Sequence, residues 1–238
     1  MQLTFLGTRG YIEAATRRHR RHSAALVASR GARIMIDCGE DWLGRLPALR
    51  PQAILVTHAH PDHAGGLRHG APCPIFATAD TWAALGETVT DRRLIRPRSL
   101  IRIRGISVEA FPVEHSLRAP AVGYRVSASG RAIFYVPDLV FIRDRHEALA
   151  GVRLYVGDGA SLTRPLIRRR GPALIGHASV ATQLVWCERE AVPAAVFTHC
   201  GTEIVSADGR CIAARIRAMG RDHGVQARVA HDGLRLQL

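Results

Sequence analysis

Short runs of apolar residues, rich in branched side chains, recur along the chain between glycine, proline and aspartate residues. Runs of three to six such residues, bounded by residues that favour turns, are typical of buried β-strands. The pattern therefore predicts eleven strands. They are expected at Gln2–Leu6, Ser23–Ala28, Arg33–Ile36, Ala53–Val56, Ile75–Ala77, Ile106–Phe111, Gly123–Val126, Ala132–Val136, Leu154–Val156, Ala194–Phe197 and Gln226–Ala230.

Helical periodicity is clearest in four other segments, three of which alternate with strands in the second half of the chain. The predicted helices are Asp80–Leu85, Leu139–Leu149, Val180–Ala191 and Ala207–His223. Many strands with few helices indicate an α+β fold, in which two sheets pack together and helices cover them. No internal repeat or low-complexity linker interrupts the pattern, so we expect a single domain over residues 1–238.

The composition fits a globular protein with an unusual basic charge. Apolar residues make up 47% of the 238 residues, and the formal net charge is +13. All 33 basic residues are arginine, which indicates a compositional bias as much as selection for phosphate binding. A basic surface still attracts polyanionic substrates or partners, including nucleic acid.

Neither a membrane span nor a signal peptide is predicted. No run of about eighteen apolar residues occurs, and the first residues lack a basic start followed by an apolar stretch. We therefore expect a cytoplasmic protein with no membrane partner. The sequence leaves open whether the chain forms a homodimer.

Acidic and imidazole side chains follow several of the predicted strands directly. His58, Asp138 and His199 each come immediately after an apolar run, and Asp37 follows Arg-Ile-Met-Ile. A strand end is a rigid position from which a side chain can reach a shared rim. Four strands that deliver such residues to one rim would assemble a functional site.

The densest cluster of candidate ligands is His58-x-His60-x-Asp62-His63. Zinc and similar divalent ions take nitrogen and oxygen ligands of this kind. Along an extended segment His58 and His60 point to the same side and can bind one ion. If a helix begins at Pro61, Asp62 and His63 turn toward a second ion. The cluster therefore predicts a site for two metal ions.

This cluster, in its place after a strand, resembles the hallmark of the metallo-β-lactamase-fold superfamily, and the resemblance spans nearly the whole chain. It implies a four-layer αββα sandwich of two mixed β-sheets flanked by helices, and a metal-dependent hydrolase. It also implies two divalent ions, zinc first, with manganese or iron as alternatives. Further motifs of the family are matched by Ile36-Asp37-Cys38-Gly39, Val113-Glu114-His115-Ser116, Tyr135-Val136-Pro137-Asp138 and Phe197-Thr198-His199.

The resemblance implies a role for each matched residue. The first ion would be bound by His58, His60 and His115, and the second by Asp62, His63 and His199. Asp138 would bridge the two ions, and Asp37 would orient the metal loop from behind. Two alternatives stay open: Asp138 could cap the predicted helix Leu139–Leu149, and His231 competes with His199 because it also follows an apolar run.

A further histidine bears on the reaction. Gly176-His177-Ala178-Ser179 resembles an element of the tRNA 3′-end-processing endonucleases, and a phosphonate-pathway cyclic phosphodiesterase branch carries a similar histidine. His177 would protonate the leaving alkoxide, and Asp158 at a strand end could orient it. Only 22 residues separate His115 from Asp138, too few for the endonucleases' long substrate-gripping arm. The segment Thr8–His22 also lacks the cysteines of the phosphonate-pathway enzymes.

The same segment contains the densest run of charge, Arg17-Arg18-His19-Arg20-Arg21-His22. Arginine forks suit phosphate oxygens, so we predict that Arg18, Arg20 and Arg21 overhang the metal rim and bind substrate. The alternative is a solvated loop. The second run, Arg168-Arg169-Arg170, is interpreted as plain surface.

The leading hypothesis is a dinuclear phosphodiesterase that acts on a nucleotide-like, cyclic or short nucleic-acid substrate. Metal-bound hydroxide would attack phosphorus, Asp62 and Asp138 would hold the ions, and His177 with Asp158 would assist the leaving group. One alternative is a lactonase or thioesterase that uses the same metal site for carbonyl hydrolysis. Another is a nucleic-acid-binding protein without catalysis.

Overall fold

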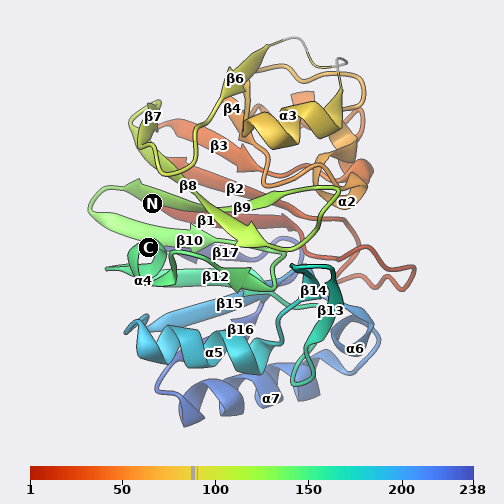
Figure 1. The fold of residues 1–238 in the computed structure, drawn as a ribbon, viewed down its shortest axis with the longest axis vertical. Helices are drawn as coiled ribbons and strands as arrows, with labels where there is room; N and C mark the ends of the chain where they lie inside the picture. Colours follow the sequence, from red (N-terminus) through yellow and green to blue (C-terminus); the bar gives the residue numbers. More distant parts are fainter. Residues whose placement is uncertain (87–88, 90) are drawn as a thin grey trace.

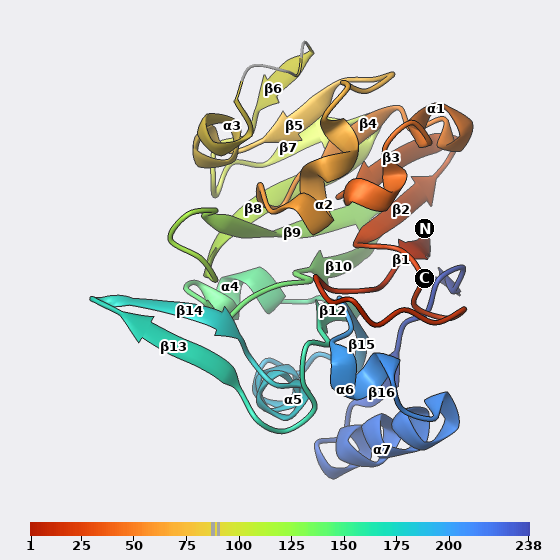
Figure 2. The same cartoon turned by 90° about the vertical axis from the view of Figure 1, so that its right-hand side faces the viewer.

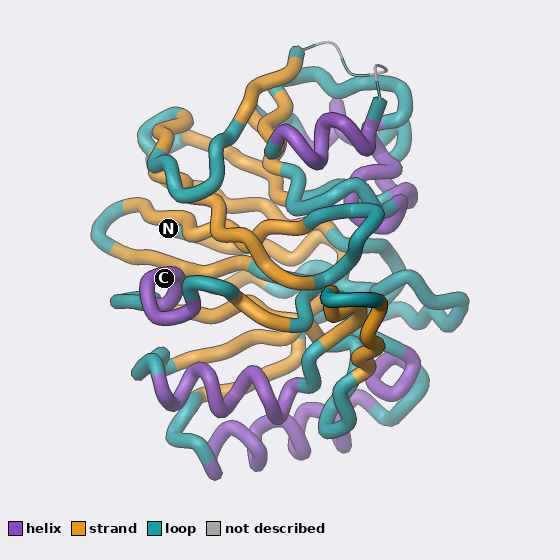
Figure 3. The backbone as a smooth tube through the Cα atoms, in the orientation of Figure 1, coloured by secondary structure: helices purple, strands orange, loops and turns teal. Residues whose placement is uncertain are grey.

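The computed structural model describes residues 1–86, 89 and 91–238. Two large mixed β-sheets face each other, and helices cover the outer side of each (Figures 1 and 3). This arrangement confirms the predicted four-layer αββα sandwich. None of the described helices is long and apolar enough to cross a membrane.

The first sheet has seven strands, in the order β17-β1-β2-β3-β4-β5-β6. Its strands from β3 to β6 are parallel, so their carboxyl ends lie at the same edge. The bounds are β1 (Gln2–Gly7), β2 (Ala24–Ser29), β3 (Ala32–Ile36), β4 (Ala53–Leu55), β5 (Ile75–Ala77), β6 (Arg92–Leu94) and β17 (Arg235–Gln237).

The second sheet has eight strands, in the order β11-β8-β9-β10-β12-β15-β16, with β7 paired to β8. Its strands from β10 to β16 are parallel. The bounds are β7 (Ile101–Ile103), β8 (Ile106–Glu114), β9 (Ala121–Ala128), β10 (Arg131–Tyr135), β11 (Phe141–Ile142), β12 (Leu154–Asp158), β15 (Ala194–Thr198) and β16 (Gln226–Val229).

A separate two-stranded hairpin, β13 (Leu166–Arg170) and β14 (Ala173–His177), projects from the body of the molecule (Figure 2). It belongs to neither large sheet. Its base nevertheless lies against the rest of the protein, because the backbone N–H of Gly176 donates to the His115 carbonyl at 3.0 Å.

Three buried apolar clusters hold the layers together. The central cluster lies between the sheets, where alternate residues of β1, Leu3 and Phe5, meet Tyr124 and Tyr135 of the second sheet. A second cluster joins the first sheet to η1 (Glu40–Trp42), α1 (Leu46–Leu49), α2 (Pro61–Ala64), η2 (Gly65–Leu67) and α3 (Ala79–Leu85). The third joins the second sheet to α4 (Arg145–Leu149), α5 (Val180–Arg189), α6 (Thr202–Val205) and α7 (Gly209–Asp222).

All eleven predicted strands overlap observed strands, but one predicted helix is wrong over most of its length. In the segment Leu139–Leu149 only α4 is helical, and β11 precedes it. The backbone N–H of Val140 donates to the Glu114 carbonyl at 2.6 Å, and Phe141 and Ile142 pair with β8. These branched and aromatic side chains favour a strand when an edge is available. Asp138 is therefore not a helix cap.

Candidate metal centre

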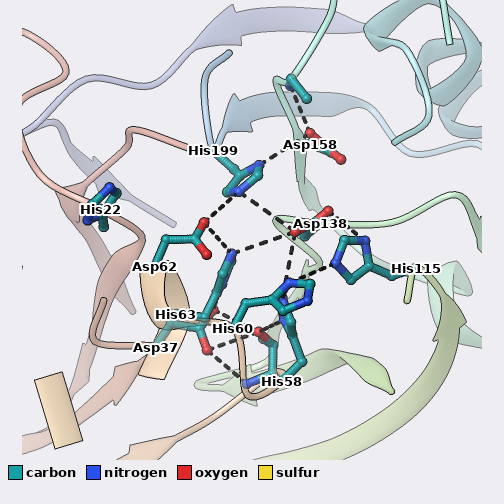
Figure 4. Close-up of polar contacts among 12 residues, drawn as sticks. His22, Asp37, His58, His60, Asp62, His63, His115, Asp138, Asp158 and His199 are labelled. Carbon is teal, nitrogen blue, oxygen red and sulfur yellow. Dashed lines mark hydrogen bonds and ion pairs between the residues drawn. The ribbon is translucent and has the colours of Figure 1, made fainter. Parts of the chain in front are cut away.

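The carboxyl ends of strands from both sheets meet at one rim, where the predicted histidines and aspartates converge (Figure 4). The loop after β4 carries His58 to His63, β8 is followed by His115, and β10 by Asp138. In the neighbouring parallel strands Asp158 ends β12 and His199 follows β15, at adjacent registers. Parallel pairing of β10, β12 and β15 therefore explains why Asp138, Asp158 and His199 come together.

The first predicted group consists of three imidazoles and one carboxylate. His60 Nδ1 lies 3.0 Å from His58 Nε2 and 3.2 Å from His115 Nε2. Asp138 Oδ2 is 3.6 Å from His58 Nε2. These separations are close to the spacing, on the order of 3.3 Å, of nitrogen ligands around one zinc ion.

The second predicted group lies on the other side of Asp138. Asp62 Oδ2 is 3.0 Å from His199 Nε2 and 3.3 Å from His63 Nε2. Asp138 Oδ2 is 3.7 Å from His199 Nε2 and 3.8 Å from His63 Nε2. The carboxylate of Asp138 thus stands between the two groups, as a bridging ligand would.

The chemistry of these side chains fits bound cations. His58, His63, Asp62 and Asp138 are buried. Among the described residues, the buried atoms His63 Nε2 and Asp138 Oδ1 have no partner with hydrogen-bond geometry. Buried polar atoms without such partners are costly, and divalent ions coordinated there would satisfy them. The roles of the individual ligands stay predictions.

Buried Asp37 fixes the orientation of two of the imidazoles. His63 donates its Nδ1–H to Asp37 Oδ2 at 2.8 Å, because a carboxylate can only accept. The Thr57 hydroxyl donates to Asp37 at 2.9 Å and accepts from His58 Nδ1–H at 3.0 Å. Both Nε2 atoms are thereby turned to the rim, where they can bind an ion once they carry no proton. The predicted position of Asp37 behind the metal loop agrees with this geometry, whereas the link through Thr57 was not predicted.

The protonation states separate into two sets. The pKa of His60 is lowered to about 4 by burial and by the neighbouring imidazoles of His115 and His63, which together outweigh Asp138 and Asp62. Burial also holds the pKa of His58 well below its usual value. Both imidazoles are therefore neutral at pH 7, with a lone pair for an ion. Burial opposes the charged form of His63, but Asp62 and Asp37 outweigh it and raise its pKa to about 9. An ion that binds His63 must displace this proton.

His177 is the last residue of β14 and lies beside the bridging carboxylate. Its Nδ1 hydrogen-bonds Asp158 Oδ2 at 2.9 Å and lies 2.9 Å from Asp138 Oδ1. Burial opposes protonation, but Asp138 and Asp158 together raise the pKa of His177 to about 10. Asp158 is itself fixed by the backbone N–H groups of Ala160 at 2.8 Å and Leu139 at 3.3 Å.

A cavity of about 720 Å³ opens over the cluster. Besides the predicted residues, its walls include Tyr11, Ile12, Arg164, Leu166 and Glu203. None of these five was singled out from the sequence, because they lie in loops or in unpredicted elements whose local patterns carry no signal for a cavity. Leu166 comes from the base of the projecting hairpin.

The structure does not bring Arg18, Arg20 and Arg21 to this cavity, so the expectation that they overhang the rim is corrected. The backbone N–H groups of Arg20 and Arg21 each donate to Asp232 Oδ2 at 3.0 Å. The Arg21 guanidinium stacks on Trp42 at 4.6 Å from the ring centroid. Arg18 lies in a different hollow, between α7 and β16.

His231 also lines the hollow between α7 and β16. It is not a member of any of the three groups of candidate ligands among the described residues. Its Nδ1 is 3.1 Å from the Asp232 carbonyl oxygen. The geometry therefore favours His199 over His231 as the last ligand.

Comparison with known proteins gives the following matches. Residues 32–200 match the Beta-lactamase superfamily domain. The chain is 30% identical over 185 residues to ribonuclease Z of Methanopyrus kandleri, covering 68% of this chain and 63% of that protein. It therefore spans less than two thirds of that relative.

Ribonuclease Z of Mycolicibacterium paratuberculosis is 25% identical over 249 aligned residues, covering 84% of this chain and 85% of that one. Among solved structures, Zn(2+)-bound PqqB from Methylobacterium extorquens superposes with a TM-score of 0.74 at 19% identity and covers all of both chains. The likeness to PqqB shows the shared fold.

Proposed function

The chain belongs to the beta-lactamase superfamily as a metal-dependent hydrolase, and we propose that it cleaves phosphodiester bonds in a nucleotide-like or short nucleic-acid substrate. The observation that carries this proposal is His177, which lines the cavity and hydrogen-bonds Asp158 beside Asp138. Two relatives named ribonuclease Z support a nucleic-acid substrate. A basic chain of net charge +13 also favours a polyanion.

The residues at the rim suit two divalent ions, of which zinc is the first candidate. His58, His60 and His115 would hold one ion, and the remaining predicted ligands, Asp62, His63 and His199, the other, with Asp138 between them. When bound, such ions lower the pKa of a water molecule and neutralise negative charge on a phosphate.

His177 would supply the proton that an alkoxide leaving group needs. Its Nδ1 is committed to Asp158, so Nε2 is the ring nitrogen that is free to donate into the cavity. Asp158 is ionised and fully buried, and it stabilises the protonated imidazole. A proton donor beside a dinuclear site is what a phosphodiester with a poor leaving group requires. Asp158 acts through His177 as a positioning residue.

Carbonyl hydrolysis is the second candidate, because part of the cavity wall is apolar. Tyr11, Ile12 and Leu166 would suit the acyl group of a lactone or thioester. A lactone would also release an alkoxide that His177 could protonate, whereas a thioester would release a thiolate that needs no proton. Loss of His177 alone therefore does not distinguish the two reactions. A substrate panel therefore separates the two candidates.

The test uses protein loaded with zinc, manganese or iron, with metal content measured by elemental analysis. We expect turnover of bis(p-nitrophenyl) phosphate and of a dinucleotide, but not of lactones or thioesters. In His177→Ala the dinucleotide rate should fall by about 10²- to 10⁴-fold. The nitrophenyl rate should fall less, because nitrophenolate leaves without protonation. Absence of phosphodiester turnover with every metal would refute the proposal.

A further inference from the structure

The β13–β14 hairpin is an exposed arm whose arginines the proposed reaction does not use. All five residues of β13 are exposed, and the hairpin projects beyond the two-sheet body (Figure 2). Its tip is the turn at Gly171, which has a φ of +59°. Leu166 is 47% exposed although it is apolar. The side chains of this arm are therefore available for contact with a molecule outside the chain.

The pairing register divides the arm into two faces. Cross-strand partners share a face, and the partners are Leu166 with His177, Arg168 with Ile175, and Arg170 with Ala173. Leu166 and His177 both line the cavity. Arg168 and Arg170 therefore lie on the face that continues from the cavity.

Arg169 pairs with Leu174 and lies on the opposite face, because side chains alternate along a strand. The run of three arginines, interpreted from the sequence as plain surface, is thus divided by the fold. Two of its members share a face with the proposed proton donor, and one does not.

The cavity-side face has the chemistry of a phosphate-binding strip. None of the three arginines of the run forms an ion pair with a residue that the structure describes. Arg168 and Arg170 are two residues apart, or about 6.8 Å along a strand, a repeat of the same order as that between successive phosphates of an extended nucleic-acid strand. On the same face Ile175 lies opposite Arg168, and Leu166 lies on the cavity side of Arg168. Both offer apolar surface to sugars or bases.

The base of the arm is fixed to the rim, so the strip has a defined position relative to the cavity. Gly176 accepts a hydrogen bond from His115 Nδ1 at 3.2 Å through its carbonyl and donates its N–H to the His115 carbonyl at 3.0 Å. Its φ is +120°, and an added Cβ would stand 1.9 Å from the Leu166 carbonyl oxygen. Glycine is therefore required where the arm joins the site.

We propose that the cavity-side face of this hairpin binds the backbone of a single-stranded nucleic acid. Successive phosphates contact Arg168 and Arg170 while the scissile phosphate lies beside His177. The inference rests on the proposed function, which it deepens by naming the substrate as an oligonucleotide longer than two nucleotides. A single row of charges that leads into one cavity fits one strand rather than a duplex.

The experiment compares Arg168→Ala/Arg170→Ala with the matched control Arg169→Ala in the metal-loaded full chain. Each protein is assayed with bis(p-nitrophenyl) phosphate and with a fluorescein-labelled single-stranded RNA of twelve nucleotides. Binding of the RNA is measured separately by fluorescence anisotropy at several salt concentrations. All variants should turn over the nitrophenyl ester at the wild-type rate, because the arginines lie outside the reacting centre.

For the RNA, the double variant should lose at least about tenfold in kcat/KM and in affinity. Its salt dependence should weaken by a slope of about 1.4, as expected for two phosphate contacts. Arg169→Ala should change either quantity by less than threefold. Equal losses in the double variant and the control, or no loss in either, would overturn the inference.

Failure of the proposed function gives a different result. In that case the wild type turns over neither phosphodiester, whereas the anisotropy measurement still reports whether the two faces of the arm differ in RNA affinity. If duplex RNA binds more tightly than the single strand and depends equally on Arg168 and Arg170, the assignment to a single strand is wrong.

Discussion

Replacement of Asp158 by asparagine tests how His177 is held and charged. The substitution keeps the size of the side chain and an oxygen that can accept the Ala160 N–H, at present 2.8 Å away. It removes the negative charge that hydrogen-bonds His177 Nδ1 at 2.9 Å. A hydrogen bond that involves a charged group stabilises by about 1.5–3 kcal/mol.

If this hydrogen bond holds His177 in position to donate its proton, its loss should lower kcat by about 10- to 150-fold. The loss should be seen with a dinucleotide, whose leaving group is an alkoxide, and should be small with bis(p-nitrophenyl) phosphate. The pKa of His177 should also fall, because one of two carboxylates that raise it is neutralised. A general acid works below its pKa, so the alkaline limb of the kcat profile should move to lower pH.

The assay measures the metal content of each protein together with the two rates, and it includes a matched control variant. Asp232→Asn is the control, since Asp232 is a half-buried carboxylate that also accepts backbone N–H groups but lies away from the cavity. Unchanged dinucleotide turnover in Asp158→Asn, or equal losses with both substrates at full metal content, would refute the role of Asp158.

Three further predictions concern the surroundings of the metal centre. Thr57→Val removes the hydroxyl that joins Asp37 to the metal loop. Thermal melting should show that the protein is less stable by about 1–3 kcal/mol, and chelator competition should show that zinc binds about 10- to 100-fold more weakly. Unchanged affinity would exclude an orienting role. Metal uptake should release the proton of His63, whose pKa is about 9 without an ion; apparent affinity should therefore rise with pH up to about 9 and level off above it. Calorimetry in two buffers of different ionisation enthalpy counts that proton, and a pH-independent affinity would contradict the assignment. Gly176→Ala should displace the hairpin, since its Cβ would meet the Leu166 carbonyl oxygen. Because Gly176 also orients His115, turnover is compared per bound metal ion, and oligonucleotide turnover should fall on that scale; wild-type turnover would show that the hairpin's position does not matter.

Most of the side chains that meet at the candidate metal centre could be predicted because they follow short apolar runs. His58, Asp138 and His199 each lie just beyond a parallel strand, and parallel strands bring their carboxyl ends to one edge whatever the rest of the chain does. Local sequence is then enough to indicate that such side chains meet. Asp158 also ends a strand, and its predicted position beside His177 agrees with the 2.9 Å hydrogen bond between them.

The arginine-rich segments could not be placed in this way, because contacts distant in sequence decide where they lie. The loop with Arg20 and Arg21 is held by Asp232, more than two hundred residues later. No local pattern reveals that partner. The prediction of a helix over Leu139–Leu149 is wrong for a related reason, since the first half of this segment forms a strand by pairing with the edge of β8.

The β13–β14 hairpin shows how substrate selection can depend on a part of the chain whose sequence looks like ordinary surface. Its last residue is His177, and the residue before it, Gly176, orients His115 through its carbonyl. One antiparallel pairing therefore fixes the proposed proton donor, a proposed metal ligand and the face on which Arg168 and Arg170 lie. A shift of one residue in that register would place Arg169, in place of Arg168 and Arg170, on the face of His177. The register of a single hairpin therefore determines both the position of the proposed proton donor and which arginines face the proposed substrate. Neither can be inferred from the arginine run alone.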